Sequence, residues 1–169
     1  MKRVMIVGCC GAGKSTFAKK LNEKLNLEVI HLDQHYWKPN WVETEKKEWE
    51  EKVKVLAAKE EWIMDGNYAG TMDIRLERAD TVFYLDVSTI KCLSRVLKRI
   101  RKYEGTTRPD MPPGCNERYD FDFLHYVAMF NLTRRKKILE KLQQQDKSQI
   151  EVIIIKDDRD IEKTLEAIF

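Results

Sequence analysis

One stretch near the start of the chain decides the fold: Val4-Met5-Ile6-Val7-Gly8-Cys9-Cys10-Gly11-Ala12-Gly13-Lys14-Ser15. Four consecutive apolar residues that end at a glycine predict a strand buried on both faces of a parallel sheet. Gly8 to Ser15 then satisfy G-x-x-x-x-G-K-[ST] and run into a helical pattern, which is the context that this phosphate-binding motif requires. The glycines let backbone N–H groups point inward at a phosphate, and the N-terminus of the following helix adds a favourable dipole. We therefore expect a phosphate site at the end of the first strand.

The residues of this loop predict which nucleotide binds. Those expected to hold ATP are Gly8, Gly11, Ala12, Gly13, Lys14, Ser15 and Thr16. We expect Lys14 to bridge the β- and γ-phosphates and Ser15 to hold Mg²⁺. The rival glycine motif of dinucleotide-binding proteins, G-x-G-x-x-G, does not fit, because Thr16 stands where its third glycine is required. The sequence thus favours ATP with Mg²⁺ over NAD.

The rest of the chain alternates between strand-like and helix-like patterns. Four more apolar runs of strand length lie at 28–32, 62–64, 81–85 and 152–155. Helical patterns lie at 14–25, 44–59, 88–102, 120–144 and 160–168. This alternation predicts right-handed crossovers between parallel strands. We therefore expect an α/β fold of three layers, α/β/α, with a five-stranded parallel sheet and with ligands at the carboxyl ends of the strands.

Size and composition narrow the remaining classes. With 169 residues, 43% of them hydrophobic, the chain is expected to form a single domain over 1–169. No run approaches 18 apolar residues, and the first apolar run is too short for a signal peptide, so we expect a cytoplasmic protein without a membrane partner. The four cysteines lack zinc-ligand spacing and are expected to be reduced. A formal charge of +3 by itself predicts neither DNA binding nor membrane binding.

Acidic side chains follow the second and third predicted strands. Asp33 comes two residues after His31, which places both on the same side of the backbone while the chain stays extended. We expect Asp33 either to bind Mg²⁺ through water or to accept a proton from a substrate hydroxyl, the alternative being a cap on the following turn. Asp65 ends an apolar strand as a Walker-B carboxylate does, and Gly66 allows a ligand to approach closely. The expected metal site therefore comprises Ser15, Asp33 and Asp65.

The segment 35–41 is unusually aromatic for a loop. Its tryptophans and tyrosine predict either a wall of an acceptor pocket or core packing under the helix that follows. The residues expected to contact the acceptor are Asp33, His35, Trp37, Asn67, Tyr68 and Arg75.

Basic residues and a long loop form the last signal. From 91 to 108 there are seven basic residues and one acid, which indicates either a solvated helix face or an anion-binding surface. The segment 103–118 holds three of the four prolines and two glycines and predicts a loop or lid. Phosphoryl transfer depends on charge stabilisation, and arginine forms bidentate pairs with phosphate oxygens. The side chains expected to act in catalysis are Lys14, Asp33, Arg99, Arg108, Arg118 and Arg135.

Several segments together resemble a known family. Besides the phosphate loop they are HLD at 31–33 with YWKPNW at 36–41, DGNY at 65–68, RLERADTVFYLD at 75–86, CLSRVLKR at 92–99 and RPDMPPGCNER at 108–118. They resemble the bacterial proteins called DNA topology modulation proteins, which are related to adenylate kinase and shikimate kinase. The resemblance implies a nucleoside-monophosphate-kinase-like fold, ATP and Mg²⁺, and a mobile lid that carries arginines.

Two departures from these relatives leave the acceptor open. Adenylate kinases carry D-G-F-P-R after the third strand, whereas DGNYA stands here at 65–69, without the arginine that grips an acceptor phosphate. Shikimate kinases carry D-x-D after the second strand, whereas His35 stands here in place of the second acid. We expect transfer of the γ-phosphoryl group of ATP to a small acceptor, either a nucleotide or a hydroxyl metabolite.

Two other classes of function stay open. One is a nucleotide-dependent regulator that binds DNA, although the sequence holds no DNA-reading motif. The other is a switch-type NTPase that needs no acceptor. The expected oligomeric state is a monomer or a homodimer.

Overall fold

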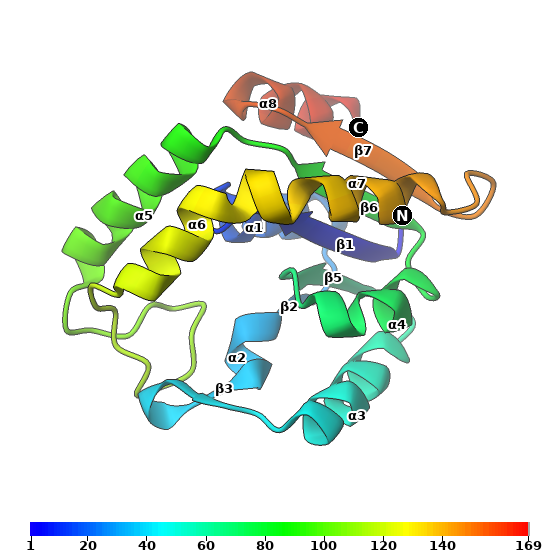
Figure 1. Ribbon diagram of the computed structural model, residues 1–169. Coiled ribbons are helices and arrows are strands. Elements are labelled where there is room, and N and C mark those ends of the chain that lie inside the picture. Colours follow the sequence, from blue (N-terminus) through cyan, green and yellow to red (C-terminus); the bar gives the residue numbers. More distant parts are fainter. Residues whose placement is uncertain (169) are drawn as a thin grey trace.

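A five-stranded parallel sheet forms the centre of the computed structural model, which describes residues 1–168 (Figure 1). Its strands are β1 (Arg3–Gly8), β2 (Val29–His31), β5 (Trp62–Asp65), β6 (Thr81–Leu85) and β7 (Glu151–Ile155), in the spatial order β2-β5-β1-β6-β7. The central strand β1 pairs with β5 and β6, in a register that places Ile6 beside Asp65 and Gly8 beside Leu85. The side chains of Val4, Met5 and Ile6 have no solvent exposure, as expected of a strand covered on both faces. The predicted five-stranded parallel sheet is confirmed.

Helices cover both faces of the sheet. They are α1 (Lys14–Leu25), α2 (Leu32–Tyr36), α3 (Lys46–Ala57), α4 (Met72–Leu76), α5 (Thr89–Tyr103), α6 (Phe121–Thr133), α7 (Arg135–Gln143) and α8 (Asp158–Ala167). In Figure 1, α7 lies in front of the sheet and α1 lies behind it. The buried apolar residues form one continuous cluster that includes side chains from the strands and from both helix layers. The predicted three-layer α/β/α architecture is thus confirmed.

The long helix predicted over 120–144 is wrong, because the chain forms two helices that meet at Arg134. At this residue φ is −118° and ψ is −34°, which breaks the helical path although backbone hydrogen bonds continue on either side. The two helices have different neighbours. α6 packs against α5, whereas α7 is tied to α4 through an ion pair of 2.7 Å between Lys141 and Asp73. A straight helix cannot follow both surfaces.

Three short elements were not predicted. The chain turns into α2 directly after β2, so Asp33 lies in the first turn of a helix, and the expectation that the backbone stays extended from His31 to Asp33 is wrong. A small antiparallel hairpin follows, formed by β3 (Trp37–Lys38) and β4 (Val42–Glu43). The helix α4 follows the DGNY segment.

The segment between α5 and α6 folds over the carboxyl ends of the strands. We call residues 104–120 the lid. Two isolated bridges, between Glu104 and Glu117 and between Thr107 and Asn116, hold its two halves together, and the side chain of Met111 within the lid is buried. The lid is therefore an ordered cover. Within residues 1–168, no helix has both the length and the apolar character needed to cross a membrane.

Candidate phosphoryl-transfer site

The glycine-rich loop after β1 curls tightly because its neighbours leave no room for side chains. At Gly8, φ is +146° and a Cβ atom would lie 2.6 Å from the carbonyl oxygen of Leu85. At Gly11, φ is +82° and a Cβ atom would lie 2.4 Å from the carbonyl oxygen of Cys92 on α5. Only glycine adopts these conformations at such close approach. The loop is thus wedged between β6 and α5, with Gly13 as the N-cap of α1.

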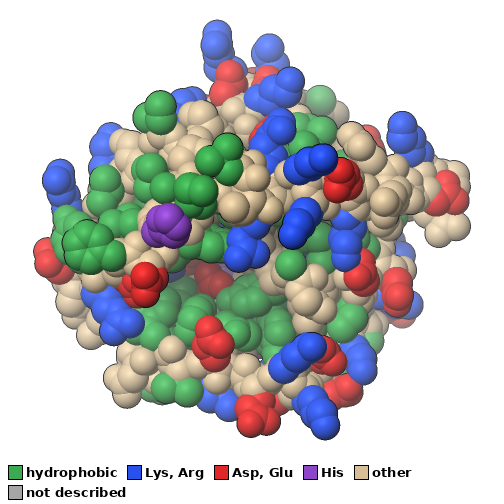
Figure 2. Space-filling model, in the orientation of Figure 1, with side chains coloured by type: hydrophobic (Ala, Val, Ile, Leu, Met, Phe, Trp, Pro, Cys, Tyr) green, Lys and Arg blue, Asp and Glu red, His purple; other side chains and the backbone are tan. Residues whose placement is uncertain are grey.

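A cleft of about 1750 Å³ opens at the carboxyl ends of the strands. Figure 2 shows this hollow with hydrophobic side chains on its floor and charged ones around it. Of the residues expected to bind ATP, those that line the cleft are Gly11, Gly13, Lys14, Ser15 and Thr16. Gly8 and Ala12 are buried within the loop and support it from behind.

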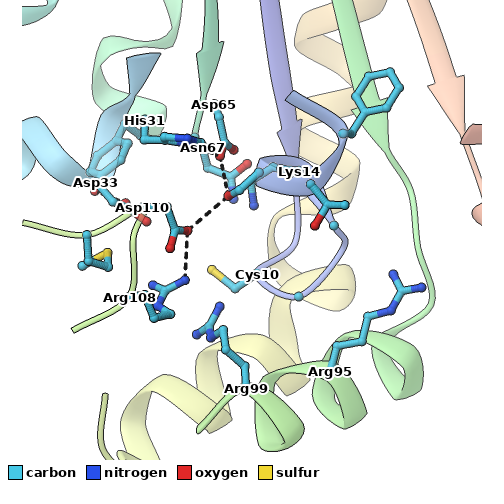
Figure 3. Close-up of a pocket in the computed structure, with 18 of the residues that line it drawn as sticks. Cys10, Lys14, His31, Asp33, Asp65, Asn67, Arg95, Arg99, Arg108 and Asp110 are labelled. Atoms are coloured by element: carbon cyan, nitrogen blue, oxygen red, sulfur yellow. Dashed lines mark hydrogen bonds and ion pairs between the residues drawn. The ribbon is translucent and has the colours of Figure 1, made fainter. Parts of the chain in front are cut away.

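Ser15 lies at the centre of a polar cluster in this cleft (Figure 3). Its hydroxyl donates a hydrogen bond to Asp65, with 2.6 Å between Oγ and Oδ2, and His31 Nδ1 lies 3.0 Å from the same carboxylate oxygen. Asp110 of the lid approaches from the other side, with 3.3 Å between Ser15 Oγ and Oδ2. The end of β5, the start of α1 and the lid therefore meet at one hydroxyl group.

The charge states of this cluster follow from its contacts. Burial by itself would raise the pKa of Asp65, but the hydrogen bond from His31, the charge of Lys14 and the Ser15 hydroxyl outweigh burial and hold this pKa below its ordinary value. The bond to Asp65 raises the pKa of His31 despite burial. Burial opposes the charged form of Lys14, yet the carboxylates of Asp65 and Asp33 contribute to a raised pKa there. Lys14 therefore stays a charged ammonium group, which can bind a phosphate, and Asp65 stays an ionised carboxylate, which can bind a cation.

Asp33 lies beside Tyr68 at one side of the cleft, and Arg95 of α5 lies at the opposite side (Figure 3). The Tyr68 hydroxyl donates a hydrogen bond to Asp33 Oδ1. Burial raises the pKa of Asp33, and the hydrogen bond from Tyr68 opposes that rise in part. A carboxylate with a raised pKa accepts a proton more readily than an ordinary aspartate does.

Aromatic side chains form the wall next to Asp33. The rings of Tyr36, Trp49 and Tyr68 pack against one another with centroids 4.7 to 5.1 Å apart. Trp49 is buried, whereas Tyr36 and Tyr68 line the cleft, as do Trp37 and Trp41 of the hairpin. The aromatic side chains of the segment 35–41 therefore line the cleft, and Tyr36 also packs against Trp49 of the helix that follows.

Arginines gather where the lid meets α5. The buried carboxylate of Glu117 lies 3.0 Å from Arg99 Nε and 3.1 Å from Arg108 Nε. Arg108 also contacts Asp110, with 3.0 Å between Nη1 and Oδ2. Arg118 lines the cleft as well, although its side chain is 62% exposed and its nearest ion-pair contact, to Asp120, is 3.8 Å long. Three of the four arginines expected in catalysis thus reach the cleft.

The lid is also fastened to the aromatic hairpin. Trp41 Nε1 donates to the carbonyl oxygen of Asn116 at 3.0 Å, and Asn40 N donates to that of Gly114, also at 3.0 Å. A third bond joins Gln34 Nε2 to a lid carbonyl oxygen at 2.9 Å. The lid therefore bridges the phosphate loop and the aromatic wall.

Three residues expected in acceptor binding or catalysis do not line the cleft. Arg75 is fully buried, and its guanidinium donates to the backbone carbonyl groups of Gly66, Asn67, Tyr68 and Thr71. Burial lowers the pKa of Arg75 to about 10. Arg135 forms a bidentate pair with Asp86, with contacts of 2.6 and 2.7 Å, and His35 lies outside the lining. The expectation that Arg75 and His35 contact a substrate directly is corrected, as is that of a cleft-facing Arg135.

Asn67 also has a structural role. Its side-chain amide accepts from Gly8 N at 2.9 Å and donates to Gly8 O at 2.8 Å. This pair of bonds clamps the DGNY segment to the phosphate loop, while Arg75 holds the same segment from beneath. Asn67 lines the cleft, but its side-chain amide is hydrogen-bonded to the backbone of Gly8.

Other lining residues were not predicted. They include Asp110 and Glu117 of the lid and Phe123 and Tyr126 of α6. The pattern R-P-D at 108–110 held a signal for Asp110, because an acid two residues from a lid arginine is placed to pair with it. Phe123 and Tyr126 gave no such signal, since α6 is apolar around most of its circumference.

Comparisons with known proteins agree with this geometry. Residues 4–110, from β1 into the lid, match the family described as AAA domain. The chain belongs to the AAA domain family. A search of curated proteins found no match.

Solved structures of kinases show the same fold. A shikimate kinase from Acinetobacter baumannii, in complex with shikimate, is 17% identical, with a TM-score of 0.61 over 99% of this chain and 90% of that chain. A shikimate kinase from Bacteroides thetaiotaomicron is 18% identical, with a TM-score of 0.57 over 99% and 96%. A deoxyadenosine kinase from M. mycoides with bound dATP is 17% identical, with a TM-score of 0.53 over 98% of both chains. At these identities the similarity establishes a kinase-like P-loop fold for this AAA domain protein.

Proposed function

We propose that the chain transfers the γ-phosphoryl group of ATP to a hydroxyl group of a small acceptor. One observation carries this proposal. The phosphate loop with Lys14 and Ser15 opens into the same cleft as Asp33 and the aromatic wall, and one lid covers both. A nucleotide-binding switch needs only the phosphate loop, whereas a transferase also needs a place for the acceptor, such as that beside Asp33 and the aromatic wall.

The donor half fits a nucleotide triphosphate and its cation. Side chains are excluded at Gly8 and Gly11, so backbone groups line the curl of the loop, and Lys14 supplies a fixed positive charge. Ser15 and Asp65 would hold Mg²⁺, Asp33 of the same cleft would bind it through water, and the cation would neutralise charge on the phosphate oxygens. Arg99 and Arg108 lie at the lid, where guanidinium groups stabilise charge on a transferring phosphoryl group.

Asp33 is the proposed general base. Its carboxylate accepts the proton of the acceptor hydroxyl while that oxygen forms a bond to the γ-phosphorus and the bond from this phosphorus to the bridging oxygen of ADP breaks. The electron pair of the broken bond stays with ADP. Tyr68 fixes the orientation of the carboxylate through its hydrogen bond. The closed lid excludes water, which would otherwise compete with the acceptor.

The aromatic wall favours an acceptor that has a flat or apolar face. Tyr36, Trp37 and Tyr68 present ring surfaces to the cleft beside the proposed base. Arg75 follows Tyr68 in the sequence, but its buried guanidinium donates to backbone carbonyl groups and offers no donor to an acceptor phosphate. We propose a hydroxyl compound with a ring, such as a nucleoside, ahead of a nucleoside monophosphate.

The DNA-binding alternative, to which the resemblance to DNA topology modulation proteins points, draws less support. In the basic stretch before the lid, Lys91 and Arg95 both pair with Asp158, and Arg99 pairs with Glu117. Two carboxylates are therefore paired with three of the cationic groups that a DNA backbone would need.

The test is a screen for acceptor-dependent ADP release from ATP. Nucleosides, nucleoside monophosphates and ring-bearing hydroxyl metabolites are supplied in turn, and Lys14→Ala serves as the inactive control. The proposal expects ADP release that depends on one class of acceptor and is lost in Lys14→Ala. ADP release that no acceptor stimulates, or that survives Lys14→Ala, would contradict it.

A further inference from the structure

A tight turn in the lid places an acidic side chain against the phosphate loop. Arg108 to Met111 form this turn, which a backbone hydrogen bond from Met111 N to the carbonyl oxygen of Arg108 closes at 3.1 Å. Pro109 stands at the second position, where its ring fixes φ near the value that common β-turns require. Gln34 Nε2 donates to the carbonyl oxygen of Pro109 at 2.9 Å, and the side chain of Met111 is buried. The remaining residue of the turn, Asp110, is therefore held in place beside the loop.

One carboxylate oxygen of Asp110 contacts both the phosphate loop and the lid. Its Oδ2 lies 3.3 Å from Ser15 Oγ and 3.0 Å from Arg108 Nη1. Asp65 Oδ2 lies 2.6 Å from the same serine hydroxyl. The dashed lines in Figure 3 follow this chain of contacts from Asp65 to Arg108. The proposed donor site uses Ser15 and Asp65 as ligands of a cation and leaves Asp110 without a role.

The separations of these oxygen atoms are close to those of a magnesium site. Mg²⁺ binds oxygen atoms in an octahedron at about 2.0 to 2.1 Å, so neighbouring ligand atoms lie about 2.9 Å apart. The distances from Ser15 Oγ to Asp65 and to Asp110 differ from this value by about 0.3 and 0.4 Å. Mg²⁺ commonly takes one or two carboxylates together with phosphate oxygens and water. A hydroxyl group and two carboxylates therefore suit the protein's share of such a site.

We propose that Asp110 is a lid-borne ligand of the Mg²⁺ that accompanies ATP, an inference that rests on the proposed donor site. Binding to the cation replaces the contact of Asp110 with Arg108 and leaves Arg108 Nη1 free for a phosphate oxygen. Arg108 stays anchored in the lid through Glu117, whose carboxylate lies 3.1 Å from Nε. The cation thus couples its own binding to closure of the lid.

This role also makes nucleotide binding depend on the cation. Without Mg²⁺, the carboxylate of Asp110 faces the phosphate oxygens of the nucleotide beside Ser15, and like charges at that distance repel each other. With Mg²⁺, the same carboxylate attracts the cation that the phosphates carry. Removing the charge of Asp110 therefore has opposite effects on the two forms of the nucleotide.

Isothermal titration calorimetry of the full chain with a non-hydrolysable ATP analogue tests this proposal. Each protein is titrated once in excess Mg²⁺ and once in EDTA. We expect Asp110→Asn to weaken binding about tenfold or more in Mg²⁺ and to leave it unchanged or tighter in EDTA. Retained binding in EDTA also shows that the variant is folded. Glu104→Gln, which removes an exposed acid from the same lid, is the matched control and should change neither affinity by more than about twofold.

Two results would overturn the proposal. One is an Asp110→Asn variant that binds the analogue in Mg²⁺ as tightly as the wild type does. The other is a variant that binds more tightly in both conditions, because the carboxylate would then compete with the phosphates instead of holding the cation. The titrations contain no acceptor, so a lack of phosphoryl transfer in the acceptor screen leaves their outcome unaffected, and the two proposals fail separately.

Discussion

Replacing Arg75 by methionine separates a structural role from a substrate-binding role. Methionine keeps the unbranched apolar stem and removes the guanidinium. The carbonyl oxygens of Gly66, Asn67 and Tyr68 then lose a charged donor. Each buried acceptor that is left without a partner costs about 1 to 3 kcal/mol, which gives roughly 3 to 9 kcal/mol for the three.

The variant also relieves a cost. Burial lowers the pKa of Arg75 from 12.5 to about 10, which corresponds to about 3 kcal/mol spent on keeping the buried group charged. The difference leaves a destabilisation of about 0 to 6 kcal/mol, with a midpoint of about 3 kcal/mol. For a chain of this length, 1 kcal/mol shifts the melting temperature by roughly 2 to 4 °C, so the midpoint corresponds to a loss of about 6 to 12 °C.

The assay is thermal denaturation followed by circular dichroism, together with ATP affinity measured well below the melting temperature. Arg78→Met, at an exposed arginine one turn further along, is the matched control and should melt within about 2 °C of wild type. We expect Arg75→Met to bind ATP with near wild-type affinity while it remains folded. If Arg75→Met melts like wild type but has a KM for the acceptor raised tenfold or more, Arg75 binds substrate and the structural reasoning is refuted.

Three further predictions concern the cleft. Asp33→Asn should lower kcat at least about 100-fold with little change in ATP affinity. Because burial raises the pKa of Asp33, the kcat/KM of the wild type should increase with pH through an acid limb above 3.8. An acid limb at or below that value would contradict the assignment of Asp33 as the base. Trp41→Phe keeps a ring but loses the hydrogen bond to Asn116, so the acceptor KM should rise about fivefold, whereas an unchanged KM would show that this bond does not position the lid. Glu117→Gln removes the carboxylate shared by two lid arginines, so limited trypsin digestion should cut the lid markedly faster than in wild type, and equal rates would count against the ion-pair cluster.

Much of the fold could be read from the sequence because the central strands β1, β5 and β6 are buried on both faces. The run Val4 to Val7 and the loop that follows it left few alternatives, since continuous apolar strands and a phosphate loop occur together in one architecture. The five residues of α2 could not be predicted, because a helix of that length shows no periodicity. The break at Arg134 arises from contacts that α6 and α7 make with different neighbours, and those contacts are not local in sequence.

The donor half of the site was likewise more predictable than the acceptor half. Lys14 and Ser15 belong to a motif with fixed spacing, and Asp65 is the last residue of β5, which pairs with β1. The position of an arginine in the sequence does not reveal whether its guanidinium binds a ligand or a backbone carbonyl group. The sequence therefore led us to expect that Arg75 contacts the acceptor, whereas its guanidinium donates to backbone carbonyl oxygens. Asp110 enters the site only because the lid folds back onto the phosphate loop.

The fate of the γ-phosphoryl group tests the central claim most directly. ATP labelled at the γ-phosphate is incubated with the enzyme, Mg²⁺ and the acceptor class that stimulates ADP release, and the labelled products are separated. The account predicts that the label appears on an organic product in a one-to-one ratio with ADP and that Lys14→Ala abolishes the transfer. Label found as inorganic phosphate at the same rate with and without acceptor would contradict it and would identify an NTPase instead.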